Sequence, residues 1–306
     1  MLEINSETDI AACRQLWEQF IPPAQLTDLW SVRECFHRNF KRELMFITVK
    51  DGGRPVGFVP LSFIPEKDYY GYFPGEVWNG KTWLEQNRII AADRNVLERV
   101  FDWLETSGKR YFLRYLIDNP NFSADTASVD EIGYIFRPGS VGFDLNGYYG
   151  QFSGKSLKKI RRDVDRIKER GLEIRTDRIE DFDIMVRMNL EQFGADSYFS
   201  DERFLQSFRD LRDHIKEKGW LRMTTVLIEG EPAAVDMGCV YRGGYTLLAG
   251  GTHSGYQGVA KVINLHHVSE ACREKYEKVD FLCGDFSWKK IFHLSPEPLY
   301  KVENIF

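Results

Sequence analysis

Residues 243–284, which decide the fold, read GGYTLLAGGTHSGYQGVAKVINLHHVSEACREKYEKVDFLCG. GGYTLLAGG predicts a β-strand, and the polar loop THSGYQG (252–258) follows it. Apolar residues then recur at the spacing of one helical face, which predicts a helix over about 259–276. These apolar residues are Val262, Leu265, Val268 and Cys272. VDFLCG (279–284) predicts the next strand.

A strand, a helix and a second strand in this order predict a right-handed parallel crossover. In such a unit the strand ends, the loop and the helix N-terminus meet at one rim of the sheet. Ligands of open α/β sheets usually bind at this rim. We therefore expect the functional site near the loop 252–258.

The chain also repeats its own pattern at an offset of roughly 170 residues. In each half a short strand runs into a helix ending in EQF, a hairpin follows, and an apolar strand closes the pattern. The matched segments are 3–20 with 173–193, 48–55 with 225–232, and 110–116 with 279–285. We predict two domains, 1–148 and 149–306.

The composition is that of a globular protein: 306 residues, 43% hydrophobic and 28% charged, with a formal charge of −5. That charge argues against a protein that binds nucleic acid through global basicity. No window approaches the ~18 apolar residues of a membrane span, and the N-terminus does not resemble a signal peptide. The five scattered cysteines lack a CxxC pair, so we expect reduced thiols, no metal and a cytoplasmic protein.

The loop before the predicted helix has the residues of an anion site. Glycines let backbone N–H groups approach a phosphate, and a helix N-terminus adds unpaired donors and a favourable dipole. The predicted cofactor-binding residues are Gly255, Gln257, Gly258, Val259, Ala260 and Lys261. The alternative is a simple tight turn. The equivalent stretch of the first half, Asn87–Asn95, has no glycine, so we expect the first domain to lack donor binding.

The strand–loop–helix–strand unit resembles the acyl-CoA site of the GNAT superfamily. KSLKKIRRDVDRIKERGLEI (155–174) and DFLCGDFSWKKIF (280–292) resemble tandem GNAT proteins of the CelD/BcsL type and their relatives, the FemABX peptidyl transferases. The resemblance implies an α/β (α+β) fold of two tandem GNAT-like domains, each a mixed, mostly antiparallel sheet flanked by helices. It implies acetyl-CoA or another acyl-CoA as the donor. Two positions depart from the pattern: Gly255 replaces the usual Gln or Arg, and Trp288 replaces Tyr.

Residues 155–170 predict a helix with basic residues on one face and an apolar stripe on another. Either the basic face is simply solvated, or it meets the phosphates of coenzyme A, a nucleotide-linked substrate or tRNA. FemABX proteins carry a similar helix, and this resemblance implies substrate contacts for Lys158, Lys159 and Arg162, with Trp288 as a further substrate-binding candidate.

Acyl transfer needs a proton acceptor for the attacking amine or hydroxyl, a stabilised oxyanion and a protonated leaving group. His253 and Asp285 are candidate proton acceptors, and Tyr256 is a candidate donor to the leaving group. Lys289 is a candidate for stabilising the oxyanion or for binding an acceptor phosphate, and the FemABX resemblance implies that a lysine at this position is functional. A solvated histidine and an exposed Lys289–Lys290 pair are the alternatives. Asp236 interrupts an apolar strand, so either a structural hydrogen bond or catalysis requires it.

Three functions fit these residues. The first is transfer of an acyl group from acyl-CoA to an amine or hydroxyl of a saccharide or peptide. The second is FemABX-like transfer from aminoacyl-tRNA to a peptide, and the third is a binding protein without activity. They share one fold, so the fold does not separate them.

Overall fold

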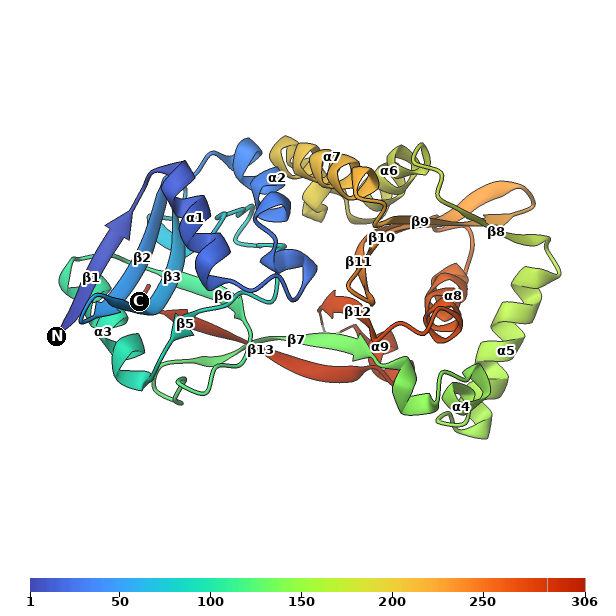
Figure 1. Ribbon diagram of the computed structural model, residues 1–306. Helices are drawn as coiled ribbons and strands as arrows, with labels where there is room; N and C mark the ends of the chain where they lie inside the picture. Colours follow the sequence, from blue (N-terminus) through green and yellow to red (C-terminus); the bar gives the residue numbers. More distant parts are fainter. Residues whose placement is uncertain (285, 306) are drawn as a thin grey trace. The chain divides into compact units, whose positions relative to one another are not determined.

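The computed structural model describes residues 1–284 and 286–305. Its chain forms two compact units (Figure 1). Of the described residues, the first unit comprises 1–132, 206–211 and 297–305, and the second comprises 133–205, 212–284 and 286–296. This division differs from the predicted domains 1–148 and 149–306, because the last strand of the chain pairs within the first unit. That the first unit is a degenerate copy of the second stays a prediction.

The first unit is built on the antiparallel strand order β1–β2–β3–β4, with β5 also paired to β3. Its elements are β1 (Leu2–Glu7), α1 (Ile10–Phe20), α2 (Trp30–Phe40), β2 (Leu44–Asp51), β3 (Arg54–Ile64), β4 (Tyr69–Tyr72), β5 (Ile90–Ala91), α3 (Arg94–Thr106), β6 (Phe112–Leu116) and most of β13 (Ser295–Glu303). β13 pairs antiparallel with β6.

Helices α1 and α3 cover opposite faces of this sheet. The ring of Phe58 on β3 stacks on Phe20 of α1, with ring centroids 4.8 Å apart. A Cβ added to the neighbouring Gly57 would lie 2.7 Å from Val96 of α3. Successive side chains of a strand point to opposite faces, so the two helices lie on the two sides.

The second unit has the strand order β7–β12–β11–β10–β9–β8. Its elements are the end of β7 (Ser128–Phe136), α4 (Leu145–Tyr149), α5 (Gly154–Lys168), β8 (Leu172–Thr176), α6 (Asp181–Phe193), α7 (Glu202–Glu217, part of which is counted with the first unit), β9 (Leu221–Ile228), β10 (Glu231–Tyr241), β11 (Gly244–Thr252), α8 (Val259–Arg273), β12 (Lys278–Cys283) and α9 (Ser287–Ile291). β11 and β12 are parallel and all other pairs in this sheet with a register are antiparallel, so the predicted parallel pairing of the two strands is confirmed, and its right-handedness stays a prediction.

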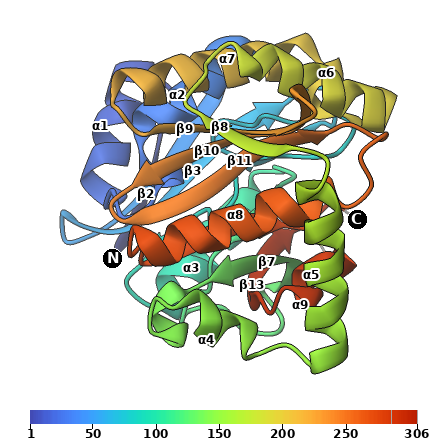
Figure 2. The same ribbon diagram turned by 90° about the vertical axis from the view of Figure 1, so that its right-hand side faces the viewer.

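Helices α6 and α8 lie on opposite faces of this second sheet. A Cβ on Gly251 of β11 would lie 2.6 Å from the carbonyl oxygen of Met185, so α6 packs directly on the strand backbone. On the other face, buried apolar residues of α8 form one cluster with β9 and β10, as the helical stripe predicts. Figure 2 shows α8 running along the sheet, with α5 crossing near one end of the helix.

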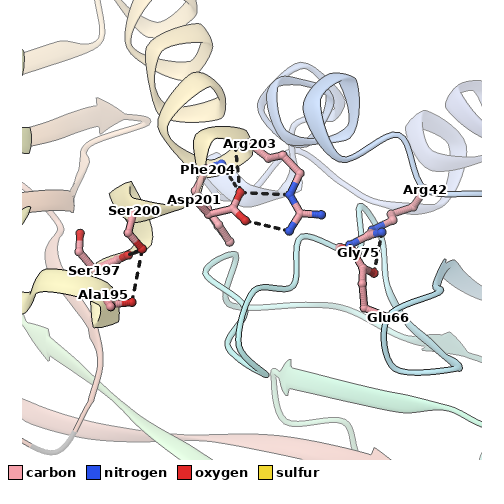
Figure 3. Close-up of polar contacts among 9 residues, drawn as sticks. All are labelled: Arg42, Glu66, Gly75, Ala195, Ser197, Ser200, Asp201, Arg203 and Phe204. Atoms are coloured by element: carbon pink, nitrogen blue, oxygen red, sulfur yellow. Dashed lines mark hydrogen bonds and ion pairs between the residues drawn. The ribbon is translucent and has the colours of Figure 1, made fainter.

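Side-chain caps fix local turns in each unit (Figure 3). In the second unit, Asp201 caps α7 by accepting hydrogen bonds from the amides of Arg203 (2.9 Å) and Phe204 (3.3 Å). Ser200 donates to the carbonyl oxygen of Ser197 at 2.8 Å in the turn before it. In the first unit, Arg42 donates to the Gly75 carbonyl at 3.2 Å and pairs with Glu66.

The parallel strands β11 and β12 separate soon after they meet. Their register covers only three pairs, from Gly244↔Lys278 to Thr246↔Asp280. β11 then continues along β10, while β12 continues along β7. β11 also carries a bulge next to Met237 and Gly238 of β10, where Leu248 is the extra residue. Beyond Thr246, backbone groups of β11 that point away from β10 lose their strand partner on β12.

Candidate functional site

The loop after β11 ends in a glycine that starts α8. Gly258 is the N-cap of α8 and has φ +93°, a backbone conformation that side-chain-bearing residues rarely adopt. A Cβ there would lie 3.7 Å from Ile167, an ordinary contact, so the backbone angle and not the available space requires glycine. The predicted helix therefore begins at Val259, directly after the glycine-containing loop.

Several backbone N–H groups around this helix start lack a hydrogen-bond acceptor within the described chain. Gly255 donates to the His253 ring, Val259 to the Tyr256 carbonyl, and Lys261 to the Gly258 carbonyl. The amides of Gln257, Gly258 and Ala260 have no acceptor among residues 1–284 and 286–305. Gln257 and Ala260 are exposed. Three unpaired N–H groups at a helix N-terminus can bind an anion such as a phosphate.

Lys261 forms an ion pair with Asp163 of α5, a contact that sequence reasoning missed. Asp163 lies on the buried face of α5 between Ile160 and Ile167. Hydrogen bonding to Lys261 holds the pKa of the Asp163 carboxyl below its ordinary value. A contact of Lys261 with the donor phosphates stays a prediction; in the structure the Lys261 ammonium pairs with Asp163 and so joins α8 to α5.

The ring of His253 is held in one tautomer by its own loop. The Gly255 amide donates to His253 Nδ1 at 3.0 Å, which requires a lone pair on Nδ1 and places the ring proton on Nε2. In this state His253 offers a donor from Nε2. This geometry favours contact with an anion and disfavours the predicted role as proton acceptor.

The Tyr256 ring lies beside Arg170, which follows the end of α5 by two residues. The Arg170 guanidinium sits 5.2 Å from the centre of its ring, and Arg170 is also paired with Glu229 at 3.1 Å. The ring packs beside the apolar cluster of α8, and its centroid is 5.3 Å from that of His253. His253 and Tyr256, both predicted site residues, are thus brought together.

Lys289 of α9 is buried, with 2% of its surface exposed, which differs from an exposed Lys289–Lys290 pair. Its ammonium group donates to three successive carbonyls at the end of β12: Phe281 (3.0 Å), Leu282 (2.8 Å) and Cys283 (2.7 Å). An ammonium has three N–H donors, so these bonds use all of them. Lys289 thus places a positive charge where β12 has left β11, and it holds the end of that strand.

Asp236 and His267 form a buried pair. Asp236 Oδ2 lies 2.8 Å from His267 Nε2, and both residues are at most 5% exposed. The pair joins β10 to α8, so the carboxylate has the partner that its place in an apolar strand requires. His253 bonds to the Ala233 carbonyl, three residues and about 10 Å along β10, so the structure does not bring Asp236 to the loop.

The remaining predicted residues lie on α5 and α9. Lys158 and Arg162 line a groove along the outward face of α5, and Lys159 is exposed on the same helix. Trp288 packs edge-on against Phe281 and Phe292, with ring centroids 5.8 and 5.7 Å away. Asp285 lies outside the described residues.

In the first unit, a carboxylate caps the start of α3, the helix that the predicted repeat matches with α8. Asp93 is the N-cap of α3, and its Oδ1 accepts a hydrogen bond from the Val96 amide at 2.9 Å. A negative charge already occupies the place where an anion would bind. This arrangement agrees with the absence of glycine from Asn87–Asn95.

Comparison with known proteins identifies the fold. Residues 154–290 match the sequence model of the acetyltransferase (GNAT) domain. The chain has a tandem GNAT fold. A tandem GNAT protein from the clavulanic acid biosynthesis pathway superposes with a TM-score of 0.53 and 12% identity, over 99% of this chain and 98% of that one.

Two further solved structures share the architecture over nearly their whole length. FemX superposes with a TM-score of 0.59 and 11% identity, covering 98% of both chains. A conserved protein of unknown function from Bacteroides thetaiotaomicron VPI-5482 has a TM-score of 0.60 and 12% identity, over 98% of this chain and 99% of that one. No curated protein matches the sequence significantly.

Within the described part of the chain, no helix combines the length and the apolar character needed to cross a bilayer. The same residues contain no group of three or more His, Cys, Asp or Glu side chains placed to hold a metal ion.

Proposed function

We propose that the second unit transfers an acyl group from acyl-CoA to an amine or hydroxyl of a saccharide- or peptide-type acceptor. The observation that carries this proposal is the set of open amides at Gln257, Gly258 and Ala260, beside two strands that separate. The amides bind the donor pyrophosphate, with His253 Nε2–H as a further donor. The donor's thioester arm then lies along β11, whose backbone groups have no strand partner there.

In the reaction, the acceptor nitrogen or oxygen loses a proton and attacks the thioester carbon. The carbon–sulfur bond breaks and the thiolate takes up a proton, for which Tyr256 is the candidate donor. Backbone amides of β11 near its bulge and the charge of Lys289 stabilise the oxyanion. Asp285 remains the candidate proton acceptor from its position in the sequence.

The proposal is tested by a thermal-shift titration with CoA, acetyl-CoA and palmitoyl-CoA, followed by mass spectrometry of acceptor mixtures. Ligand binding raises the melting temperature with the logarithm of ligand concentration over the dissociation constant. We expect stabilisation by CoA that Gly258→Val abolishes. Gly219→Val is the matched control, because Gly219 has φ +74° in a turn with no atom near its Cβ position. Equal stabilisation of both variants, or none in the wild type, would refute the donor site.

The basic face of α5 favours a second candidate, a FemABX-like transfer from aminoacyl-tRNA. Lys158, Arg161, Arg162 and Arg166 line its outward groove, and Asp163 already neutralises Lys261. If tRNA is the donor, binding weakens steeply with salt, and replacing Lys158 and Arg162 by Ala reduces the slope of log affinity against log salt by about 1 to 2. CoA binding without detectable tRNA binding at low salt excludes this candidate.

A further inference from the structure

The second unit contains a separate polar pocket of about 390 Å³ at the other end of β11 and α8. It is lined by Tyr245 at the start of β11, by His267 of α8, and by Arg222 and Asp177 from β9 and the end of β8. Tyr245 and Thr252 are about 23 Å apart along β11, so this pocket is distinct from the loop that starts α8. Its volume suits a small metabolite.

Tyr245, which forms part of the floor of the pocket, has a buried hydroxyl without a hydrogen-bond partner in the described chain. Tyr245 is 4% exposed, and its Oη has no hydrogen-bond partner within the described chain. Burial, followed by the nearby Asp236 charge, raises the pKa of Tyr245 well above its ordinary value, so the phenol keeps its proton. A buried phenol without an acceptor costs free energy, because its bonds to water have been lost.

His267 shares this floor. Asp236 accepts or shares a proton at Nε2, and Nδ1 has no partner among the residues that the structure describes. The neighbouring His266 also lines the pocket, and burial lowers its pKa to about 4. His266 therefore adds no charge near neutral pH.

Two opposite charges of the lining are unpaired. Arg222 donates to the carbonyls of Gly219 and Leu221 and bonds to the Tyr276 side chain, but it meets no carboxylate in the described residues. Asp177 binds the Met223 amide weakly, at 3.4 Å, and meets no cation in the same residues. Arg222 and Asp177 do not pair with each other, although they line one pocket. A ligand carrying both charges would complement them.

We propose that this pocket binds a small zwitterion with one carboxylate and one ammonium group, of the free α-amino acid class. The carboxylate pairs with Arg222 and the ammonium with Asp177. The Tyr245 hydroxyl and the His267 ring bond to the ligand between these charges. The site is independent of the proposed acyl transfer and lies apart from its donor loop.

The test is isothermal titration calorimetry of the full chain with glycine, L-alanine, L-glutamine and L-phenylalanine as probes. Propionate and ethylamine serve as analogues that each carry one of the two charges. We expect at least one amino acid to bind at one site, and both analogues to bind at least about tenfold more weakly. The proposal fails if no amino acid binds at about 10 mM, or if propionate or ethylamine binds as well as the matched amino acid.

Charge-neutral variants locate the site. Arg222→Gln and Asp177→Asn each lower the affinity about tenfold or more, and asparagine tolerates the left-handed backbone of Asp177 at φ +58°. Arg187→Gln, an exposed arginine on α6, is the matched control and keeps full affinity. Unchanged affinity in both charge variants overturns the assignment.

Tyr245→Phe distinguishes a ligand contact from a structural role. The hydroxyl has no hydrogen-bond partner among residues 1–284 and 286–305, so its removal leaves the stability of the unliganded chain equal or higher. We expect the variant to bind the amino acid more weakly all the same. Full affinity in a folded Tyr245→Phe chain contradicts the proposed contact.

Discussion

At the scale of single residues, replacing Lys289 removes the hydrogen-bond donor of three backbone carbonyls. Lys289→Met keeps the length of the side chain but leaves three carbonyls at the end of β12, one buried and two partly buried, without their donor. We expect the free energy of unfolding to fall by about 2 to 4 kcal/mol. Urea denaturation measures this loss of stability, and Lys290→Met, a change at the exposed neighbouring residue, is the control. Equal loss in both variants would show that the carbonyl contacts do not matter.

Sequence reasoning located several of these residues but not their partners. Asp236 stood out because a carboxylate interrupted an apolar strand, yet nothing local named His267, which lies 31 positions later. The signal that could have found it is a histidine on the apolar face of the predicted helix. Lys289 was singled out by resemblance, whereas its burial depends on how the chain turns after β12, which spacing does not encode.

At the scale of elements, the pairing of Asp163 with Lys261 joins α5 to α8 and makes their contact sensitive to acid. The folded-state pKa of Asp163 is depressed by Lys261, so its contribution to stability is complete above the unfolded value, about 4. That contribution is lost as the pH falls through the folded pKa. We expect Asp163→Asn to be less stable than the wild type at pH 7 and the two unfolding curves to converge below about pH 3.

Thermal unfolding of the wild type and of Asp163→Asn, measured between pH 7 and about pH 2.5, checks this expectation. Asp165→Asn, at an exposed position of the same helix, is the control. A constant difference between Asp163→Asn and the wild type over the whole range would exclude the ion pair as its cause.

The strand, loop, helix and strand of residues 243–284 were predictable because each has its own periodicity or turn residues. The separation of β11 from β12 was not. It depends on which neighbour each strand keeps, and β12 keeps β7, a strand more than 140 positions earlier in the chain. Apolar alternation is the same whether a strand stays with one neighbour or leaves it.

At the scale of the whole molecule, the C-terminal segment belongs to the first unit. Tyr300 and Val302 of β13 pair with Leu116 and Leu113 of β6, and Asn304 bonds to the backbone of Tyr111. A chain truncated after Pro296 leaves an unpaired β6 edge and removes the buried Val302 side chain. We expect the first unit to lose at least about 2 kcal/mol of stability.

Hydrogen exchange at the amides of Leu113 and Leu116 measures this loss, because their protection depends on β13. Val302→Thr keeps the strand and the side-chain shape, so it should speed the exchange less than truncation does. Unchanged protection after truncation would contradict the assignment of β13 to this unit. The predicted boundary between residues 148 and 149 missed the pairing of β13 with β6, because pairing between sequence-distant strands leaves no local pattern.

The starts of α3 and α8 differ in one respect: the Asp93 side chain caps the first, whereas Gly258 begins the second without a side-chain cap. Every titration with a phosphate compound therefore includes an internal control, the capped start of α3. In a single NMR sample, the Gly258 resonance reports occupancy while the Val96 resonance reports everything else that the additive does to the solution.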